Sequence, residues 1–404
     1  MTPDASPGAT PGRFQTLPEA TWPRLRALLD AHTPGGDPVN MTIGEPKHPF
    51  PDWLPDMLHS HAAEYGKYPD NNGLPELREA IAAWMGRRYG LAIDADSQVM
   101  ALNGTREGLF SAALALSADE KNGRPAILLP NPFYPVYGVA SLAVGAEPFY
   151  VPATAETGHL PDYAALPEDV LNRTTVAYIC SPANPQGRVA NADYWKRLLD
   201  LAERYDFRIF SDECYSEIYR DTPPPGGLEM AARFSADPER VISFHSLSKR
   251  SNLPGLRSGF VAGGPRSMVE IKRLRALAGA PLPNPVQRVS AAVWADEAHV
   301  VANREQYADK FRQADHIFAG IETYESPEAG FFLWLKVGEG EEFALDLWKE
   351  TGVRTLPGAY LSRDVRGMNP GADYIRVALV APMDEMTRGL RALRAHLDRK
   401  TGRG

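Results

Sequence analysis

Cysteine is scarce in this sequence of 404 residues, which contains only Cys180 and Cys214. Two cysteines cannot form a disulfide framework, and both stand in or beside apolar runs typical of core strands, so we interpret them as small buried hydrophobic residues. Long apolar runs are also missing, since none approaches the roughly 20 residues of a membrane span. A basic segment followed by an apolar one, which would mark a secretory signal, is absent as well. We therefore expect a cytoplasmic protein with no membrane partner.

An excess of positive charge is missing too. The chain has 43 Lys and Arg against 51 Asp and Glu, a net charge of −8. Nucleic-acid-binding domains are usually basic, so we expect no nucleic-acid partner. What is present is ordinary globular composition, 44% hydrophobic and 23% charged. This length leaves room for one large or two moderate domains.

Strand-like and helix-like runs alternate along the first two thirds of the chain. An amphipathic helix is expected over 74–89, after a shorter one over 22–29 and a strand end over 41–46. Short apolar strands separated by helices predict an α/β fold with a mostly parallel sheet covered on both faces. Expected strands lie at 99–102, 126–129, 175–180, 208–211, 241–244 and 259–262, with helices at about 107–116, 134–144 and 194–205.

The pattern changes after a Pro-rich break at 280–285. Long helical runs continue to about residue 318, followed by expected strands at 331–335, 353–356 and 374–378 and a last helix to about 397. This part predicts a second, smaller α/β domain. We expect a disordered tail at 1–13, an arm at 14–48 belonging partly to the small domain, a large domain at 49–295 and the small domain at 296–404.

Polar motifs follow the expected strands, and in such sheets active residues gather at the carboxyl ends of strands. Lys249 comes after the run 241–244, and a lysine can form a Schiff base with a carbonyl. Its neighbours Ser246 and Ser248, with Arg257, could bind a dianionic phosphate through hydroxyls and a planar fork of donors. A surface loop with ordinary charges is the alternative interpretation of this motif taken alone.

Four further motifs stand at strand ends. Asn103-Gly104-Thr105-Arg106 would place free backbone N–H groups at a helix N-terminus, where anions bind. Tyr134 could stack on a flat heterocycle. Asn184, held extended by the following proline, could donate to a phenolate oxygen, as could Tyr215. Asp212 would be partly buried and would need a cation such as a protonated ring nitrogen.

Each of these four motifs also has a plain structural explanation, as a helix cap, a core aromatic or a turn. The combination of the four motifs with Lys249 has no such structural explanation. An aldehyde, a phenolate oxygen, a ring nitrogen and a phosphate on one flat heterocycle describe pyridoxal 5'-phosphate, and each of these groups has a candidate partner. The sequence therefore predicts this cofactor.

The ordered motifs resemble those of fold-type I pyridoxal-phosphate enzymes of the class I/II aminotransferase family, from about residue 14 to 400. The matching positions are Gly44, Tyr68, Gly104-Thr105-Arg106, Tyr134, Asn184-Pro-x-Gly187, Asp212-x-x-Tyr215, Ser246-x-Ser248-Lys249, Arg257 and Arg376. The resemblance implies a large domain with a seven-stranded, mostly parallel sheet and a smaller α/β domain. It also implies a homodimer with shared active sites.

Roles at the matching positions are likewise implied by the resemblance. Lys249 would hold the cofactor and carry a proton, Asp212 would pair with the ring nitrogen, Tyr134 would stack on the ring, and Asn184 and Tyr215 would hold the ring oxygen. Gly104, Thr105, Arg106, Ser246, Ser248 and Arg257 would surround the phosphate, with Tyr68 reaching it from the partner subunit. Arg376, Asn184 and the backbone of Gly44 would bind the substrate α-carboxylate. No residue is assigned to a metal. Many relatives carry a small or polar residue where this chain has Arg106.

Within the family, the chain most resembles bacterial succinyldiaminopimelate aminotransferases, in stretches such as 44–48, 67–75, 248–255 and 281–287. The implied reaction is glutamate-dependent transamination giving N-succinyl-LL-2,6-diaminopimelate, in lysine biosynthesis. Lys47, Arg250 and Arg354 are candidate cations for the succinyl carboxylates, with solvated surface charge as the other interpretation.

Three alternatives compete with this function. The first is an aminotransferase for aspartate, aromatic or kynurenine-type substrates, and the second is a C–S lyase on the same fold. The third is a regulator carrying an N-terminal DNA-binding domain, for which residues 1–40 are too short and the net charge is unsuited.

Overall fold

The computed structural model describes residues 12–17, 19–400 and 402. Its larger sheet has seven strands in the order β2-β8-β7-β6-β5-β3-β4. Six of them are parallel to one another, and β8 is antiparallel to its neighbours β2 and β7. The predicted mostly parallel sheet is thereby confirmed. The strands are β2 (Val99–Leu102), β3 (Ala126–Asn131), β4 (Glu147–Pro152), β5 (Thr174–Cys180), β6 (Arg208–Asp212), β7 (Val241–Ser246) and β8 (Gly259–Gly263).

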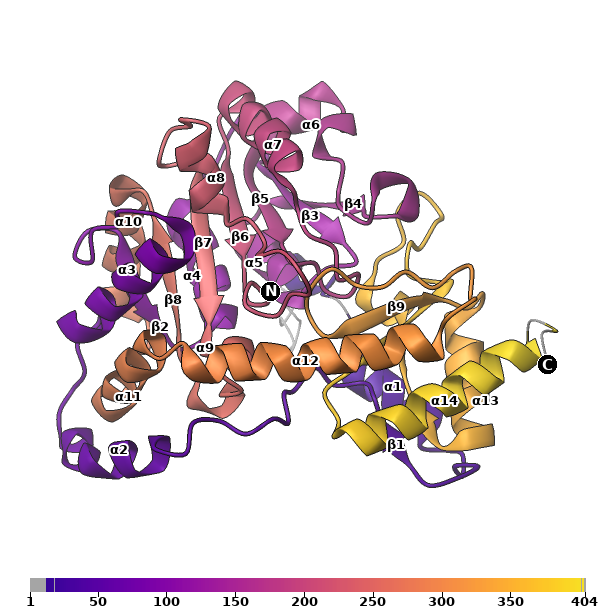
Figure 1. Cartoon of the computed structure of the whole chain (residues 1–404). Helices are drawn as coiled ribbons and strands as arrows, with labels where there is room; N and C mark the ends of the chain where they lie inside the picture. Colours follow the sequence, from indigo (N-terminus) through magenta and orange to yellow (C-terminus); the bar gives the residue numbers. More distant parts are fainter. Residues whose placement is uncertain (1–11, 18, 401, 403–404) are drawn as a thin grey trace, which may run out of the picture.

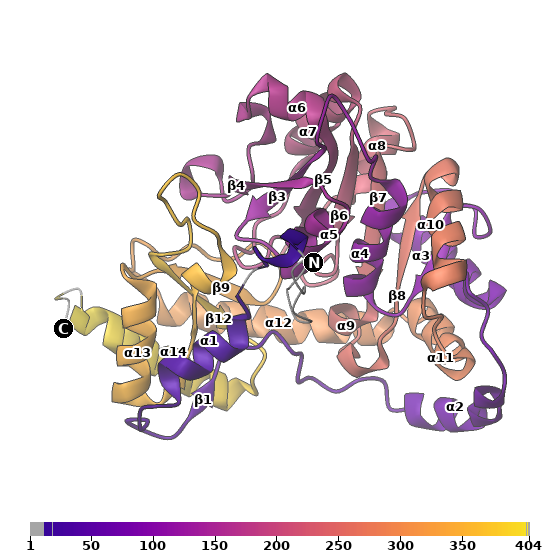
Figure 2. The ribbon, with the colours of Figure 1, turned by 180° about the vertical axis from the view of Figure 1, so that it is seen from behind.

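Helices cover both faces of this sheet because successive side chains of each strand point to opposite faces. In β2, Val99 and Ala101 pack into one core cluster and Met100 and Leu102 into another. Figure 1 shows α7 and α8 in front of the sheet, and Figure 2 shows α4 on the opposite face. The covering helices are α3 (Pro75–Tyr89), α4 (Thr105–Leu116), α5 (Pro135–Ala143), α6 (Glu168–Arg173), α7 (Ala192–Tyr205), α8 (Gly227–Arg233), α10 (Pro265–Ala278) and α11 (Asn284–Ala295).

The smaller part of the molecule is built around a three-stranded antiparallel sheet in the order β11-β12-β9. A two-stranded parallel pair, β1 with β10, lies beside it, so the N-terminal arm joins the C-terminal elements (Figure 2). The elements are α1 (Thr21–Leu29), β1 (Val39–Asn40), β9 (Phe332–Lys336), α13 (Gly340–Thr351), β10 (Val353–Arg354), β11 (Leu356–Pro357), β12 (Tyr374–Ala378) and α14 (Met383–Lys400).

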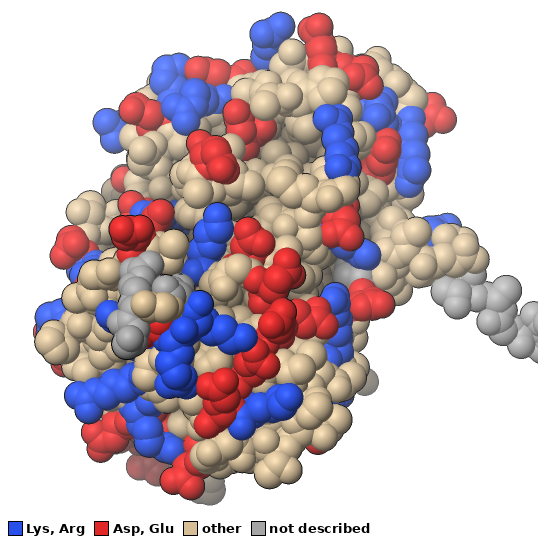
Figure 3. All heavy atoms as spheres, turned by 90° about the vertical axis from the view of Figure 1, so that its right-hand side faces the viewer, with Lys and Arg blue, Asp and Glu red and all other residues tan. Residues whose placement is uncertain are grey.

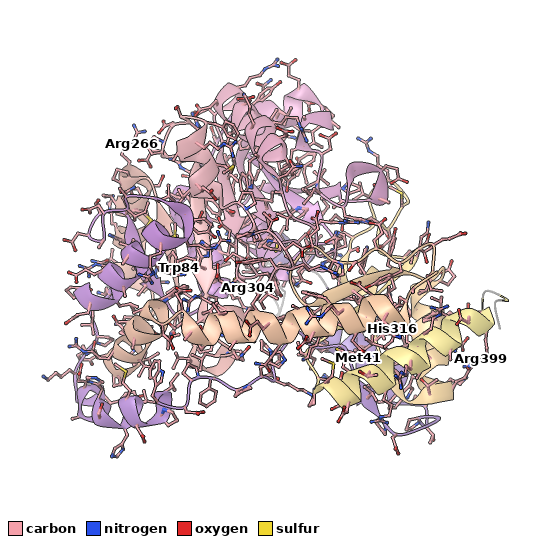
Figure 4. All side chains as sticks on the ribbon, in the orientation of Figure 1. Met41, Trp84, Arg266, Arg304, His316 and Arg399 are labelled. Carbon is pink, nitrogen blue, oxygen red and sulfur yellow. The ribbon has the colours of Figure 1, made fainter. Side chains whose placement is uncertain are left out.

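One long helix, α12 (Ala298–Ile317), runs from α11 to the region of α14 and so underlies both parts (Figure 1). Arg304, labelled in Figure 4, projects from α12 and donates to Glu217 at 3.0 Å. Arg88 of α3 donates to the other oxygen of Glu217 at 2.7 Å. The buried carboxylate of Glu217 therefore links α12 and α3 to the turn that follows β6. Asp212 is the last residue of β6.

Several elements differ from the sequence predictions. The strand end expected over 41–46 is wrong, because the strand is β1 (Val39–Asn40) and the following residues are irregular. The single strand expected over 353–356 is two short strands, β10 and β11. Strand β4 was not predicted, nor were α2 (Leu54–Ser60), α6, α8, α10 and α13. Short 3-10 helices lie at η1 (Gly12–Phe14), η2 (Ala62–Gly66), η3 (Ala155–Thr157), η4 (Tyr163–Ala165), η5 (Pro254–Leu256) and η6 (Gly358–Leu361), with α9 at Leu247–Arg250.

The proposed division into tail, arm and two domains stays a prediction. Residues 1–11 of the predicted disordered tail lie outside the described residues, and Gly12 and Arg13 belong to η1. The face carrying α13 and α14 shows basic and acidic side chains interspersed (Figure 3). One ion pair between these helices joins Arg399 to Glu350 at 2.8 Å. Among the described helices, none has the length and apolar character needed to cross a bilayer.

Candidate active site

A cavity of about 590 Å³ opens at the carboxyl ends of β5, β6 and β7, between the large sheet and the smaller part. It brings together most of the residues singled out in the sequence. Its lining includes Gly44, Thr105, Arg106, Tyr134, Asn184, Asp212, Tyr215, Ser246, Ser248, Lys249, Arg257 and Arg376. Gly104 and Tyr68 are not part of this lining. Residues from the N-terminal arm, among them Trp22 and Ile43, close one side.

Lys249 stands in the short helix α9, directly after β7. Its Nζ donates a hydrogen bond to the carbonyl oxygen of Gly44, and the ring centroid of Phe331 lies 5.5 Å away. Burial disfavours the charged ammonium and lowers the pKa of Lys249 from 10.5 to about 8. A large fraction of this amine is therefore neutral at mildly alkaline pH and able to act as a nucleophile or base.

Asp212 ends β6 and is buried. The hydroxyl of Tyr137 donates to Asp212 Oδ2 at 2.7 Å. Burial raises the pKa of the Asp212 carboxyl, while the Tyr137 and Cys214 donors oppose that rise. Tyr137 was not assigned a role from the sequence, although it stands three residues after Tyr134 at the start of α5. One helical turn separates the two positions, and that spacing could have indicated that both face the site.

A corner suited to a phosphate lies at the start of α4. Gly104 has φ +84° and ψ 155°, a backbone region essentially open only to glycine, and the Arg257 guanidinium lies against it, 2.2 Å from where a Cβ would be. The Oγ of Ser246 donates to Ser248 Oγ at 2.9 Å and accepts from the Ser248 backbone N–H at 3.1 Å. Arg257 Nη1 donates to the nearby Pro254 carbonyl at 2.8 Å. Helix N–H groups, two hydroxyls and a guanidinium thus converge where a dianion would bind.

The ring-binding candidates lie along the same cavity. Asn184 Nδ2 lies 3.4 Å from the Tyr215 hydroxyl, and burial raises the pKa of Tyr215, so this phenol stays protonated and can donate. Arg106 Nε donates to the Tyr134 hydroxyl at 2.6 Å. The arrangement leaves the Asn184 and Tyr215 donors together on one side and the Arg106–Tyr134 pair on the wall formed by α4 and α5.

Arg376 reaches the cavity from β12 of the smaller part. Its Nη1 donates to Asn184 Oδ1 at 3.1 Å and its Nη2 to the Thr42 carbonyl at 2.7 Å. Its buried Nε has no hydrogen-bond partner among the described residues. Burial lowers the pKa of Arg376 to about 10, so the guanidinium remains charged at neutral pH. Arg376 lines the cavity and forms no ion pair with a carboxylate of the described residues, so its charged guanidinium is suited to a substrate carboxylate.

Other predicted residues lie elsewhere. Tyr68 is fully exposed on the surface of its own chain. Arg250 is buried, pairs with Glu297 at 2.8 Å and lies 4.9 Å from the Trp294 ring centroid. It is therefore neither a cavity residue nor a solvated surface charge, and both interpretations of it were wrong. Arg354 pairs with Asp30 at 2.7 Å, and Lys47 is exposed.

The two cysteines are free and half-buried, and both pack against the core of the smaller part as well as lining the cavity. Cys214 Sγ lies 3.1 Å from Thr105 Oγ1. Burial raises the pKa values of both thiols, which keeps them protonated.

These residues fit pyridoxal 5'-phosphate. A lysine of lowered pKa, a buried carboxylate and an anion-binding corner that admits only glycine face one cavity, and the fold and site together define a pyridoxal-phosphate-dependent enzyme of fold type I. The sequence model of the family Aminotransferase class I and II matches residues 36–393. The chain belongs to this family, so its activity is that of an aminotransferase and its cofactor is pyridoxal 5'-phosphate.

Similar proteins span nearly the whole chain. An LL-diaminopimelate aminotransferase of Dehalococcoides mccartyi is 30% identical, over 94% of this chain and 97% of that protein. The crystal structure of an aminotransferase from Neisseria meningitidis is 40% identical, with a TM-score of 0.91, covering 95% of this chain and 99% of that one. A probable N-succinyldiaminopimelate aminotransferase from Thermus thermophilus is 25% identical, with a TM-score of 0.82 over 93% of this chain and all of that one (100%).

Proposed function

We propose that Lys249 binds the cofactor aldehyde and carries the α-proton of the substrate. The observation that carries this proposal is the place of Lys249, a half-buried lysine that lines the same cavity as Asp212, Arg257 and Arg376, with its pKa lowered to about 8 by burial. When bound, pyridoxal phosphate supplies an electron sink for the electron pair left at the substrate Cα. Lys249 Nζ, in its neutral form, has the lone pair needed to accept that proton, and general-base catalysis of this kind contributes typically ~10²–10⁴-fold.

The neighbouring residues set the orientation of cofactor and substrate. Asp212, supported by Tyr137, would pair with the ring nitrogen and keep it protonated. Asn184 and Tyr215 would hold the ring oxygen, and Tyr134 would stack on the ring. Gly104, Thr105, Ser246, Ser248 and Arg257 bind the phosphate. Arg376 binds the substrate α-carboxylate with Asn184 and Gly44, and the position of all three on the cavity wall supports this role.

For the amino substrate we propose N-succinyl-LL-2,6-diaminopimelate, with glutamate and 2-oxoglutarate as the other pair. The motif stretches at 44–48, 67–75, 248–255 and 281–287 support this choice, as does the likeness to the Thermus protein. LL-2,6-diaminopimelate is the second candidate, because the relative that is 30% identical over nearly the full chain bears that name.

A substrate panel tests this proposal. The holoenzyme is assayed with 2-oxoglutarate and, in turn, N-succinyl-LL-2,6-diaminopimelate, LL-2,6-diaminopimelate, aspartate, phenylalanine and kynurenine, and glutamate formation is followed. The succinylated compound should give the highest kcat/KM. A higher value for LL-2,6-diaminopimelate would select the second candidate. A thioether amino acid that gave ammonia and pyruvate without any 2-oxo acid would instead indicate a C–S lyase.

We further propose a homodimer in which Tyr68 completes the phosphate site of the partner subunit. Tyr68 lies in the loop before α3 and does not line the cavity of its own chain. The phenol is fully exposed in the single chain, which suits a side chain that is covered only on association.

A further inference from the structure

The segment 43–50 of the N-terminal arm carries Gly44 but belongs to no helix or strand. In the described part of the chain, its residues form no hydrogen bond between backbone groups. Side chains from other elements hold it instead. Lys249 Nζ donates to the Gly44 carbonyl, and the other two positions held by hydrogen bonds are His48 and Pro49. The place of Gly44 in the cavity therefore depends on residues outside the arm.

Asn303, a buried residue of α12, ties His48 to the chain at Lys249. Its Nδ2 donates to the carbonyls of Lys249 and Arg250 at 3.5 and 3.4 Å. Carbonyl oxygens only accept, so the amide nitrogen faces them and Asn303 Oδ1 faces His48. The same Oδ1 accepts from Asn252 Nδ2 at 3.1 Å. One side-chain amide thus links the arm, α12 and the residues around Lys249, where the arm passes α12 (Figure 1).

His48 is the donor in its 2.9 Å contact with Asn303, because Asn303 Oδ1 can only accept. Burial, together with the charge of Lys310, lowers the pKa of His48 from 6.5, although the contact with Asn303 opposes this change. Near pH 7 the ring is therefore neutral, with its one N–H at Nδ1. The ring also lies against Tyr307 of α12, with centroids 4.6 Å apart, so His48 is held from two sides.

The contact between Lys249 and Gly44 does not persist in the working enzyme. Under the proposed function, the Lys249 amine binds the cofactor aldehyde and no longer holds the Gly44 carbonyl. The hydrogen bonds at His48 and Pro49 then keep the segment 43–50 in place. Only three residues separate Gly44 from His48, and one of them is the buried Pro46, whose ring fixes φ. An anchored His48 therefore restricts where the Gly44 backbone can lie.

We propose that His48 and Asn303 are positioning residues that hold the Gly44 backbone where the substrate α-carboxylate binds. Neither side chain belongs to the cavity lining, so both act through the arm and not on the substrate itself. The inference rests on the proposed role of Gly44 in binding the α-carboxylate. Loss of the His48 hydrogen bond should weaken substrate binding and leave the chemical step nearly unchanged.

The test follows the half-reaction of the holoenzyme with glutamate by cofactor absorbance, over a range of glutamate concentrations. His48→Phe keeps a ring against Tyr307 but loses the donor. The half-saturating glutamate concentration should rise about 3- to 10-fold, as expected for one lost hydrogen bond, with little change in the limiting rate. His48→Asn keeps a nitrogen donor at the same number of bonds from Cβ and should restore the parental value.

A binding measurement without turnover accompanies the kinetics. Glutarate has both carboxylates of glutamate but no amino group, so it binds without reacting. Calorimetric titration of the holoenzyme with glutarate should show the same loss of affinity in His48→Phe and its recovery in His48→Asn. The cofactor Kd, measured by titration of apoprotein, should remain parental in both variants, because His48 does not line the cavity.

His299→Phe is the matched control. His299 Nε2 lies 2.8 Å from Ser251 Oγ, so it also ties α12 to the chain after Lys249, but within the described chain it is not hydrogen-bonded to the segment 43–50. This variant should lose stability and keep the parental affinity for glutamate and glutarate. Equal losses of affinity in His48→Phe and His299→Phe, a loss in limiting rate alone, or no recovery in His48→Asn would overturn the proposal.

Arg376→Lys separates this inference from the proposed function on which it rests. If Arg376→Lys kept the parental affinity for glutamate and glutarate, the α-carboxylate site itself would lie elsewhere. If Arg376→Lys lost affinity while His48→Phe did not, only the positioning role of His48 and Asn303 would fail.

Discussion

At the scale of single residues, the state of Lys249 decides when the site can react. Its pKa is lowered to about 8 by burial, so the neutral amine dominates above that pH and the ammonium below it. Capture of added pyridoxal phosphate by apoprotein should therefore speed up about tenfold per pH unit below 8 and level off above it. Stopped-flow absorbance at a series of pH values measures this.

The same experiment has a chemical control. Borohydride reduction of the holoenzyme followed by peptide mapping should label Lys249, and Lys249→Ala should show neither label nor capture. A rate that continued to rise toward pH 10.5, the ordinary lysine value, would show that the amine is not held in a desolvating environment. A label on Lys272 would remove Lys249 from its proposed role.

Tyr137 offers a second test at this scale, through its 2.7 Å hydrogen bond to Asp212. Tyr137→Phe removes a donor that opposes the raised pKa of Asp212, so the carboxyl should accept a proton at higher pH than in the parent. The acid limb of the kcat profile should move to higher pH, and kcat near neutrality should fall about tenfold for a lost hydrogen bond to a charged group.

Tyr178→Phe is the matched control for this change. Tyr178 stacks on Tyr137 with centroids 4.4 Å apart, and its buried hydroxyl donates to the Leu109 carbonyl at 2.9 Å rather than to Asp212. It should lower stability without moving the acid limb. If both variants moved the limb equally, the effect would come from packing and not from the Asp212 hydrogen bond.

At the scale of elements, the sequence was most informative where chemistry and secondary structure coincide. Residues such as Asp212 and Lys249 were found because a polar motif directly follows an apolar strand, and strand ends meet at one edge of a parallel sheet. Arg250 was misread because charge suggests solvent, whereas two tryptophans and Glu297 bury it. Those partners come from α3, α11 and the α11–α12 turn, far along the chain, so no local pattern could reveal them.

The start of α4 depends on a single glycine. Gly104→Ala would place a methyl group 2.2 Å from Arg257 Nη2 and force a side chain into a backbone conformation with φ +84°. We expect Arg257 to be displaced and the cofactor Kd to rise roughly 10-fold or more, for a cost on the order of 1–3 kcal/mol. Titration of apoprotein with pyridoxal phosphate measures the change.

Gly145→Ala provides the comparison. Gly145 has a similar φ of +76°, but nothing lies within 4 Å of the position of an added Cβ. This variant should lower the melting temperature through backbone strain and keep the parental cofactor Kd. Equal cofactor affinity in both variants would mean that the contact between Gly104 and Arg257 does not shape the phosphate corner.

At the scale of the whole molecule, the segment 50–68 exposes an unusual number of aromatic side chains. Phe50, Trp53, Tyr65 and Tyr68 are 45%, 37%, 57% and 101% exposed. Large apolar groups gathered on one segment are typical of an interaction surface, and a two-fold dimer is the commonest closed assembly. The surface that carries Tyr68 is thus suited to association with a second copy of this chain.

Subunit exchange tests whether each active site borrows Tyr68. Two weak variants, Lys249→Ala and Tyr68→Ala, are mixed at limiting cofactor. In the mixed dimer one site carries both defects, while the other has its own Lys249 and an intact Tyr68 from the partner subunit. Activity should therefore rise above that of either parent variant, toward half of one normal dimer per mixed dimer. If Tyr68 served its own subunit, neither site of the mixed dimer would be whole, and mixing would restore nothing even when mass spectrometry showed complete exchange.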